Sequence, residues 1–577
     1  LCLVVPDWIF TQIGYIDPYI YLGYFRNFSQ HIVTFAGTYY GTRLPFIIPG
    51  YICYTVFPPL AANYILHLGF YFVALFSLYF ILRLTVNRRV ALISATFMGF
   101  YPYFLAATGW DYLIDGAGIA YFLLTVLLLT LAAKSPHITQ ISHPRQSSRK
   151  LLTKKGAILL LLAGMSFAGL IYTNTFLVIM TPSLALYYFL MQPKSWILSL
   201  KSAFIAGCGL AIATMLLGIV NIAVGKNLLF FMPSFKFAVS LVLHPHPMLI
   251  SGYAWLLRVP FMVFPFFTFL SSLLFIILAL PHGKHGLFTM DILLQIARDN
   301  IFSLCHLLNF LIMLIMQLLG TPVFQFQYYA NFLLPTALLA AGAQLALPLS
   351  RLSKSHYTGI AIITIILSGG AYLIYYHTPL RSLMSYKDSI WYVSAMFAAG
   401  ALCLILGNRY QRKLQILPIG VAFLFFVCAA ATLFPTNYGQ MYYCACNQRQ
   451  QNFLAVIKSD DIIRAHDTTG NLRFWYSDAE PLGRLYTSIA STRLWGYRLI
   501  NTKFPQISEN PTATCPKPVI EIPPGTDIVI MSSNKDAFGL ANEALNRLGL
   551  HAELIRTEKI TQGSISFTMT FIRAKAY

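Results

Sequence analysis

The sequence predicts a polytopic α-helical membrane protein of about 13 transmembrane helices, the first one truncated, followed by a soluble α/β extracytoplasmic domain. Of its 577 residues, 57% are hydrophobic and only 10% are charged, and the mean hydropathy is +0.65. Soluble proteins carry about 25% charged residues, and no water-soluble shape hides this much apolar surface. The composition therefore excludes a soluble enzyme, a disordered chain and a nucleic-acid-binding module.

The charges divide the chain into two parts. Residues 1–434 contain 25 Lys and Arg but only seven acidic residues, and the first glutamate of the chain is Glu480. Residues 435–577 contain 15 basic and 12 acidic residues, an ordinary balance for a soluble domain. We therefore predict a membrane part over 1–434 and a water-soluble domain over 435–577.

The membrane part contains repeated apolar runs, and about 20 apolar residues are enough to cross about 30 Å of hydrocarbon. The predicted spans are 62–82, 90–107, 116–133, 156–173, 176–191, 202–224, 258–280, 301–319, 328–349, 357–376, 390–407 and 414–434. Leu1–Val5 has the composition of the end of an earlier span. We therefore expect the sequence to start within its first helix.

Lysine and arginine concentrate in alternate loops of the membrane part. Counting from Arg83–Arg89, alternate loops hold 18 basic residues and the opposite loops hold seven. Because basic loops stay in the cytoplasm, the opposite side should carry the C-terminal domain, a long first outer loop over 6–50 and a short second outer loop over 108–115. The net charge of +21 is thus a topology signal rather than a nucleic-acid footprint. The membrane we expect is a bacterial inner membrane.

The C-terminal part shows the apolar patterns of an α/β domain. The predicted elements are strands at 472–477 and 527–531, a helix at 535–548 capped by Ser533 or Asn534, and a hairpin of 551–560 with 564–571. A bridge from Cys515 to Cys444 or Cys446 would fit an oxidising compartment. The segment contains no nucleophile elbow, phosphate loop or metal-ligand spacing, so we predict a lid, scaffold or acceptor-docking role.

Four of the seven acidic residues of the membrane part lie in its first two outer loops, where aromatic residues flank them. Carboxylates at a membrane surface are costly unless they are hydrated or paired, so these acids are candidate site residues. The alternative for Asp17, Asp111 and Asp115 is a helix-capping role, with Pro18 at a first helical position after Asp17. Arg43, in Tyr39-Tyr-Gly-Thr-Arg43-Leu-Pro45, has the alternative of a simple interfacial anchor.

This arrangement resembles the GT-C superfamily of membrane glycosyltransferases. The resemblance lies in a long outer loop with an early Asp and a later Arg-x-Pro, followed by a short outer loop with another acid. The number of spans and the exported C-terminal domain are similar to the branch that contains lipid A aminoarabinose transferases, and protein O-mannosyltransferases are more distant. A second, weaker echo is Gln327-Tyr328-Tyr329-Ala-Asn331-Phe-Leu-Leu-Pro335, in which Asn331-Phe332 replaces the Arg-Tyr of the family.

The resemblance implies transfer of a sugar from a polyprenyl-phosphate donor to an acceptor hydroxyl at the outer membrane face, with inversion. Asp17 would be the general base, Asp111 would orient the acceptor or stabilise the sugar ring, and Asp115 is a substitute for it. The residues implied in binding the donor phosphate are Arg43 first, Arg258 second, and Tyr328 with Tyr329. The partners would be this donor, membrane lipids and a lipid, glycan or protein acceptor. We expect no cofactor and no obligatory metal, although Asp17 and Asp111 could hold a divalent ion as in oligosaccharyltransferases.

Three other classes of membrane protein compete with this interpretation. A transporter or flippase would carry charged residues in mid-span and broken helices in paired halves, and the sequence shows neither. A polysaccharide polymerase or ligase would use a large outer loop in mid-chain, but the loop 225–257 is only moderate. A receptor would bind its ligand in the exported domain, which has no visible site.

Overall fold

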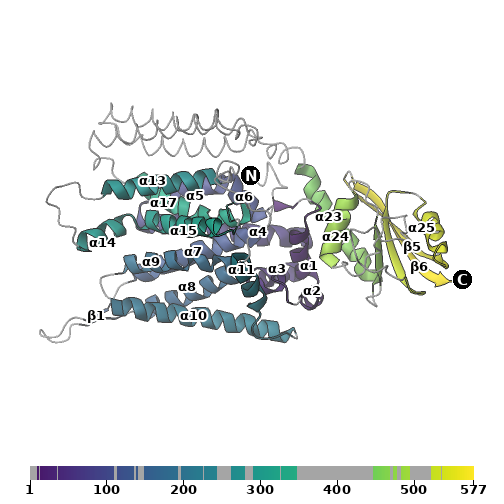
Figure 1. Ribbon diagram of the computed structural model, residues 1–577, viewed down its shortest axis with the longest axis horizontal. Coiled ribbons are helices and arrows are strands. Elements are labelled where there is room, and N and C mark those ends of the chain that lie inside the picture. The colour runs from purple at the N-terminus through teal and green to yellow at the C-terminus, as the bar shows by residue number, and fades with distance from the viewer. Residues whose placement is uncertain are drawn as a thin grey trace, which may run out of the picture.

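The computed structural model describes residues 9–346 and 446–577. Its longest internal gaps are 110–113, 141–148, 244–261, 280–289, 468–471, 477–481 and 494–521. Helices dominate residues 16–346, and a sheet with helices forms the C-terminal part (Figure 1). Five described helices are long and apolar enough to cross a membrane: α4 (Pro59–Thr85), α7 (Ile114–Lys134), α8 (Lys154–Thr173), α10 (Trp196–Ala223) and α15 (Ile301–Leu318). The chain is therefore an integral membrane protein.

Local sequence determines where several of these helices begin. The Thr153 hydroxyl caps α8 by accepting a hydrogen bond of 3.1 Å from the amide of Gly156. Asn87 caps α5 (Arg88–Phe100) in the same way, accepting at 2.9 Å from the Val90 amide. Side-chain oxygens at these positions satisfy amides that have no partner within the helix.

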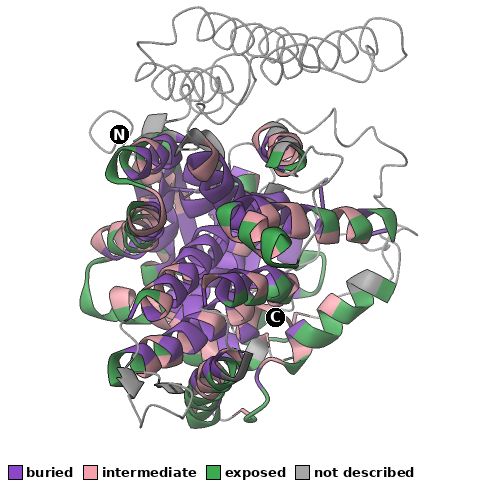
Figure 2. Ribbon diagram, turned by 90° about the vertical axis from the view of Figure 1, so that its left-hand side faces the viewer, coloured by how far each residue is buried: buried purple, intermediate pink, exposed green. Residues whose placement is uncertain are grey.

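The bundle packs around α7, whose apolar window is 67% buried, whereas that of α10 is only 17% buried. Buried faces point inward and exposed faces outward in Figure 2. Glycine lets α8 and α10 approach closely, because a Cβ at Gly164 would lie 1.9 Å from the Ala206 carbonyl oxygen, and one at Gly209 2.0 Å from that of Leu161. Such small-residue contacts are typical of helices that associate in a membrane.

Three predicted spans differ from the structure because proline or a polar residue interrupts them. The span 90–107 is two helices, α5 and α6 (Pro102–Gly109), since Pro102 cannot donate to the preceding turn. The span 176–191 is a 3-10 turn, η3 (Thr175–Met180), followed by α9 (Thr181–Met191). The span 328–349 is α16 (Gln327–Ala330), η5 (Asn331–Leu333) and α17 (Leu334–Ala346). The spans 357–376, 390–407 and 414–434 lie outside the described residues.

The remaining described helices of this part include two that the sequence did not predict. The span 258–280 is represented by α13 (Val263–Ala279). The unpredicted helices are α14 (Met290–Asp299) and α11 (Met232–Leu243), the latter within the outer loop 225–257. Two short strands, β1 (Ile138–Gln140) and β2 (Arg149–Leu151), pair antiparallel in the basic loop between α7 and α8.

The segment predicted as the first outer loop is mostly helical. It forms α1 (Ile16–Arg26), α2 (Phe28–Thr34), the 3-10 turn η2 (Tyr40–Thr42) and α3 (Leu44–Val56). In Figure 1 these elements lie between the helical bundle and the C-terminal sheet. Residues at the start of α4 and α7 and at the end of α10 join the hydrophobic cluster around α1 and α3. The segment from α1 to α3 therefore covers one end of the bundle.

The C-terminal part is a four-stranded mixed sheet with helices. Its order is β3 (Arg473–Tyr476), β4 (Asp527–Ser532), β6 (Ile565–Ala576) and β5 (Leu550–Gln562), with β3 and β4 parallel and the other pairs antiparallel. The helices are α23 (Cys446–His466), α24 (Leu482–Arg493) and α25 (Ala537–Asn546).

The predicted strands and hairpin of this part are present in the structure, and two helices were missed. Ile565, Phe567, Met569 and Phe571 alternate into one buried cluster, as the period of two predicted. The predicted cap was wrong, because α25 begins later and Asp536 caps it by accepting from the Gly539 amide at 3.0 Å. The bridge predicted for Cys515 falls outside the described residues.

Candidate functional site

Asp17 and Arg43 lie in one cluster with three tyrosines, Tyr21, Tyr39 and Tyr40, which we call the tyrosine cluster. The Tyr40 hydroxyl donates to Asp17 Oδ1 at 2.6 Å. Arg43 Nη1 donates to the Tyr21 hydroxyl. Asp17 and Arg43 are 26 residues apart in the sequence. The structure thus brings together Asp17 and Arg43. The sequence predicted the first as the general base and ranked the second first for binding the donor phosphate.

Local sequence explains how the chain returns to α1. Asp17 stands in the first turn of α1, where a negative charge is favourable at a helix N-terminus. After α2, Gly37 adopts a φ of 81°, a value that favours glycine, and the chain reverses into η2. Arg43 is the N-cap residue of α3, and Pro45 occupies its first turn.

Aromatic rings enclose the Arg43 guanidinium. Its Cζ lies 4.8 Å from the ring centroid of Tyr39 and 5.7 Å from that of Tyr21, which are cation–π distances. Burial lowers the pKa of Arg43, but the acidic groups of Tyr21, Tyr39 and Asp17 outweigh this effect and raise the pKa above its ordinary value. Arg43 is therefore a fixed positive charge at every physiological pH.

Helix α11 forms a further wall of the tyrosine cluster. The Phe237 ring stacks on Tyr39 with centroids 4.8 Å apart. The Ser234 hydroxyl shares a hydrogen bond with that of Thr42. Helix α11, within residues 225–257, therefore contacts the segment between α2 and α3.

Asp115 lies near this site but is fully buried. Its neighbours Ile114 and Ala117 pack in the same hydrophobic cluster as Tyr21. Asp115 occupies the first turn of α7, where its charge is favourable to the helix dipole. This position agrees with the capping alternative more directly than with contact to an acceptor.

The other predicted site residues do not join the tyrosine cluster in the described structure. Asp111 and Arg258 lie outside the described residues, as does the side chain of Tyr328. Tyr329 is buried in the core of the bundle, where its ring centroid lies 4.8 Å from that of Phe176. This is a different hydrophobic cluster from the one that holds Tyr21, and a role of Tyr328 and Tyr329 in binding phosphate stays a prediction.

Sequence reasoning missed the residues that organise the site. Tyr21, Tyr39 and Tyr40 were noted only as flanking aromatics, and Ser234 and Phe237 were not identified. The available signal was the density of tyrosine around Asp17 and Arg43. The contact with α11 has no local signal, because it joins residues 39–42 to residues 234–237.

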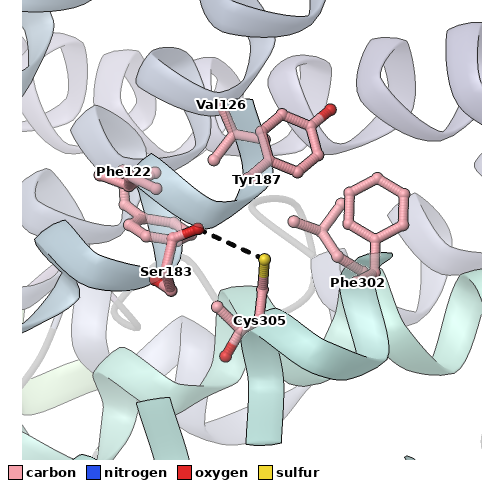
Figure 3. Close-up of a pocket in the computed structure, with 9 residues that line it drawn as sticks. Phe122, Val126, Ser183, Tyr187, Phe302 and Cys305 are labelled. Carbon is pink, nitrogen blue, oxygen red and sulfur yellow. Dashed lines mark hydrogen bonds between the residues drawn. The ribbon is translucent and has the colours of Figure 1, made fainter. Parts of the chain in front are cut away.

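Two pockets of the described structure are each too small for a sugar. One lies in the bundle between Tyr187, Phe302 and Cys305, and has a volume of about 10 Å³ (Figure 3). The Cys305 thiol there donates to the Ser183 carbonyl at 3.4 Å. A second pocket, of about 20 Å³, lies between α1 and Phe453. Volumes of this size hold about one water molecule, whereas Asp17 is half-exposed.

Within the described residues, no group of three His, Cys, Asp or Glu side chains is placed to hold a metal ion. Because Asp111 is outside these residues, the choice between a metal-free site and an ion held by Asp17 and Asp111 stays a prediction.

His31 of α2 should make the stability of this region sensitive to acid. Its ring is fully buried against α1, where a Cβ on Gly23 would lie 1.9 Å from Nε2. Burial lowers the pKa of His31 from 6.5 to about 3; the charge of Arg493 adds to this effect, and the carbonyls of Ser491 and Asn27 oppose it. The folded state therefore binds fewer protons than the unfolded state between pH 6.5 and 3, and stability is lost as the pH falls through this window.

We expect the thermal midpoint of the purified protein to fall between pH 7 and pH 5, and His31→Phe to flatten this dependence. The contribution of His31 is at most about 1.4 kcal/mol per pH unit below 6.5. His551→Phe, on β5, is the matched control and should leave the slope unchanged. Equal slopes for wild type and His31→Phe would contradict the assignment.

The fold and the site define an integral membrane protein with a tyrosine-rich polar site at one end of its helical bundle. No protein-family model and no curated protein matches the chain. Among solved structures it is similar to ArnT from Cupriavidus metallidurans bound to undecaprenyl phosphate, with a TM-score of 0.47, 11% identity, and coverage of 99% of this chain and 96% of that chain. The apo state of the same protein aligns over the same shares with a TM-score of 0.43 and 11% identity.

ArnT is a lipid A aminoarabinose transferase of the GT-C family, the group that the sequence resembles.

Proposed function

We propose that the chain is a glycosyltransferase that moves a sugar from a polyprenyl-phosphate donor to an acceptor hydroxyl. The observation that carries this proposal is the meeting of Asp17 and Arg43 in the tyrosine cluster. One carboxylate and one fixed cation beside apolar helices suit a reaction in which a base takes a proton while a lipid-linked phosphate leaves. The apolar bundle offers a medium for the polyprenyl tail.

Asp17 is the base in this proposal. Its Oδ1 accepts from Tyr40, so we assign Oδ2 to the acceptor hydroxyl. As Oδ2 takes the proton, the acceptor oxygen forms a bond to the anomeric carbon, and the bond from that carbon to the phosphate oxygen breaks. Direct displacement of this kind inverts the anomeric carbon. A positioned base contributes about 10²–10⁴-fold to the rate.

Arg43 stabilises the leaving phosphate in this proposal. The phosphate gains negative charge as its bond to the sugar breaks, and a preorganised cation is most effective where charge develops. Tyr21 and Tyr39 hold the guanidinium in place before the substrate arrives. The fork of the guanidinium can then bind two phosphate oxygens.

The remaining roles are also proposals. Asp111 would orient the acceptor or stabilise the positive sugar ring, and Arg258 would be a second contact to the phosphate. The burial of Asp115 and Tyr329 supports structural roles for both. The basic excess of alternate loops supports an outer location for the site and the C-terminal part, in a bacterial inner membrane.

Tyr40→Phe should separate the positioning of the base from donor binding. The substitution removes the hydrogen bond to Asp17, and such a bond to a charged group contributes about 1.5–3 kcal/mol. We expect kcat to fall at least about tenfold while the donor KM changes little. Tyr51→Phe, on α3, is the control. An unchanged kcat would remove Tyr40 from the mechanism.

The proposal is tested with purified protein, a panel of polyprenyl-phosphate sugars and a membrane extract as acceptor. Mass spectrometry should detect free polyprenyl phosphate with the wild type and not with Asp17→Asn. The mass gained by the acceptor identifies the sugar and the acceptor class. No release from any donor in the presence of extract would contradict the proposed function.

The proposed orientation is tested separately with an epitope tag after Tyr577. In intact cells with a permeabilised outer membrane, an impermeant label should reach this tag. Labelling that requires opening the inner membrane would place the C-terminal part, and with it the proposed site, on the cytoplasmic side.

A further inference from the structure

Helix α24 of the C-terminal part lies alongside α1, the helix that carries Asp17 (Figure 1). Just before α1 begins, the Gly14 amide donates to Ser488 Oγ at 2.9 Å. A Cβ on Gly14 would lie 3.3 Å from the Arg484 side chain, and the φ of Gly14 is 98°. At the other end of α1, Arg26 donates to Asp460 and Asp461 of α23. The C-terminal part therefore contacts α1 at both ends.

Apolar side chains fill the space between these two contacts. Tyr19 and Leu22 of α1 belong to the same buried cluster as Leu485 and Ile489 of α24. The N-terminal segment adds Phe10, whose ring centroid lies 5.2 Å from that of Phe453 on α23. This cluster is continuous with the core of the C-terminal sheet, so one face of α1 is packed as part of that unit.

Asp460 of α23 is the centre of the contact at the end of α1. Its Oδ2 accepts from Arg26 Nε at 2.7 Å, and its Oδ1 accepts from Arg493 Nε of α24. Arg26 Nη2 also donates to Asp461 Oδ1 at 2.5 Å. The Asp460 side chain is 0% exposed, that of Arg26 7% and that of Arg493 9%. One buried carboxylate thus joins two buried guanidinium groups from different parts of the chain.

A buried ion cluster of this kind is better suited to fixing geometry than to adding stability. Removing charges from water is costly, and a well-packed apolar contact often stabilises a fold as well or better. The value of the cluster lies in its directional hydrogen bonds, which permit one orientation of α1 against α24. Asp17 and Arg26 are nine residues apart on one helix, which is about 13 Å along its axis. A tilt of α1 at Arg26 therefore displaces Asp17.

We propose that Asp460 is a positioning residue for the transfer reaction: by holding Arg26 of α1 against Arg493 of α24, it sets the direction of the helix that carries Asp17. This inference rests on the proposed function of Asp17. It gives the C-terminal part a role within the site, because α24 holds α1, the helix that carries Asp17, in a fixed orientation. The role differs from a lid or an acceptor-docking module, either of which could move without moving Asp17.

The test compares Arg26→Met, which removes the link to α1 and leaves the Asp460–Arg493 pair, with Arg26→Lys and Asp460→Asn. Arg573→Met is the control, because it breaks the exposed Asp527–Arg573 pair of the same sheet. For each full-length protein, hydrogen exchange is measured over residues 15–27 and over β4 and β6. The kcat and donor KM are measured in parallel. Hydrogen exchange over residues 15–27 reports whether the ion cluster holds α1, without any assumption about catalysis.

We expect faster exchange over residues 15–27 in Arg26→Met and unchanged exchange in β4 and β6. Its kcat should fall about 10–10²-fold with a donor KM within about threefold of wild type, since a misplacement of about 1 Å costs about 10²-fold in rate. Arg26→Lys should recover part of kcat, and Arg573→Met should change neither the exchange over residues 15–27 nor kcat. If Asp460→Asn fails to fold, Arg26→Met still decides the outcome.

Two results would overturn the inference. Unchanged exchange over residues 15–27 in Arg26→Met would show that the ion cluster does not hold α1. Faster exchange with an unchanged kcat would show that the ion cluster holds α1 but does not position the base. A different result is also distinguishable. If the wild type is inactive with every donor but exchange is faster in Arg26→Met, the proposed function is overturned, and the role of the ion cluster in holding α1 is retained.

Discussion

Asp17→Asn should reduce sugar transfer by about 10²–10⁴-fold, the usual contribution of a positioned general base. The amide is almost the same size as the carboxylate and can still accept from the Tyr40 hydroxyl. The substitution therefore removes the ability to take a proton and little else. We expect the thermal midpoint and the donor KM to stay close to those of the wild type, with the loss confined to kcat.

Asp299→Asn is the matched control, because Asp299 is an exposed acid of α14 that accepts from Gln295 at 2.9 Å. It should keep full activity. Full activity of Asp17→Asn would remove this residue as the base. A similar loss in both variants would show that the assay reports on net charge or expression rather than on the site.

Arg43→Ala should lower kcat/KM by about 10²–10³-fold, the cost of removing one preorganised donor from a site where negative charge develops. The loss should include a higher donor KM, since the guanidinium would contact the phosphate before and during bond breaking. Arg43→Lys should recover only part of the activity, because an ammonium keeps the charge but lacks the planar fork and packs poorly between Tyr21 and Tyr39.

Arg298→Ala is the control for this experiment. Arg298 is a partly buried cation of α14, and its Nη2 donates to the Gln192 carbonyl at 3.4 Å. The variant should bind the donor normally. If Arg43→Ala leaves kcat/KM and the donor KM unchanged, another cation must bind the leaving phosphate. Arg258 is the next candidate.

The sequence alone predicted much of the architecture because the signals for it are local. Apolar runs such as 116–133 and 301–319 correspond closely to α7 and α15, since crossing a bilayer demands a continuous apolar helix. The hairpin of β5 and β6 followed from strict alternation and from Gly563, whose φ is 57°. Helix breaks at Pro102 and in the segment before α17 were missed, because the mean hydropathy of a window does not change when a single backbone hydrogen bond is lost.

The candidate site was predictable only in part. A sequence that contains few acids and keeps Asp17 in an outer loop already marks that residue, and the Arg-x-Pro pattern marks Arg43. Neither signal contains the distance between them. The structure supplied that relation through Tyr21 and Tyr40, and it shows that Asp115 and Tyr329 are buried.

What the sequence by itself determined, then, is the membrane class of this protein and the α/β pattern of its C-terminal part. Composition, charge asymmetry and apolar periodicity act over tens of residues, so they can be read along the chain. What only the tertiary structure decided is the pairing of α1 with α24 and the meeting of Arg26 with Asp460, which are 434 residues apart. Contacts at that separation depend on how two packed units fit together, and no local pattern encodes that fit.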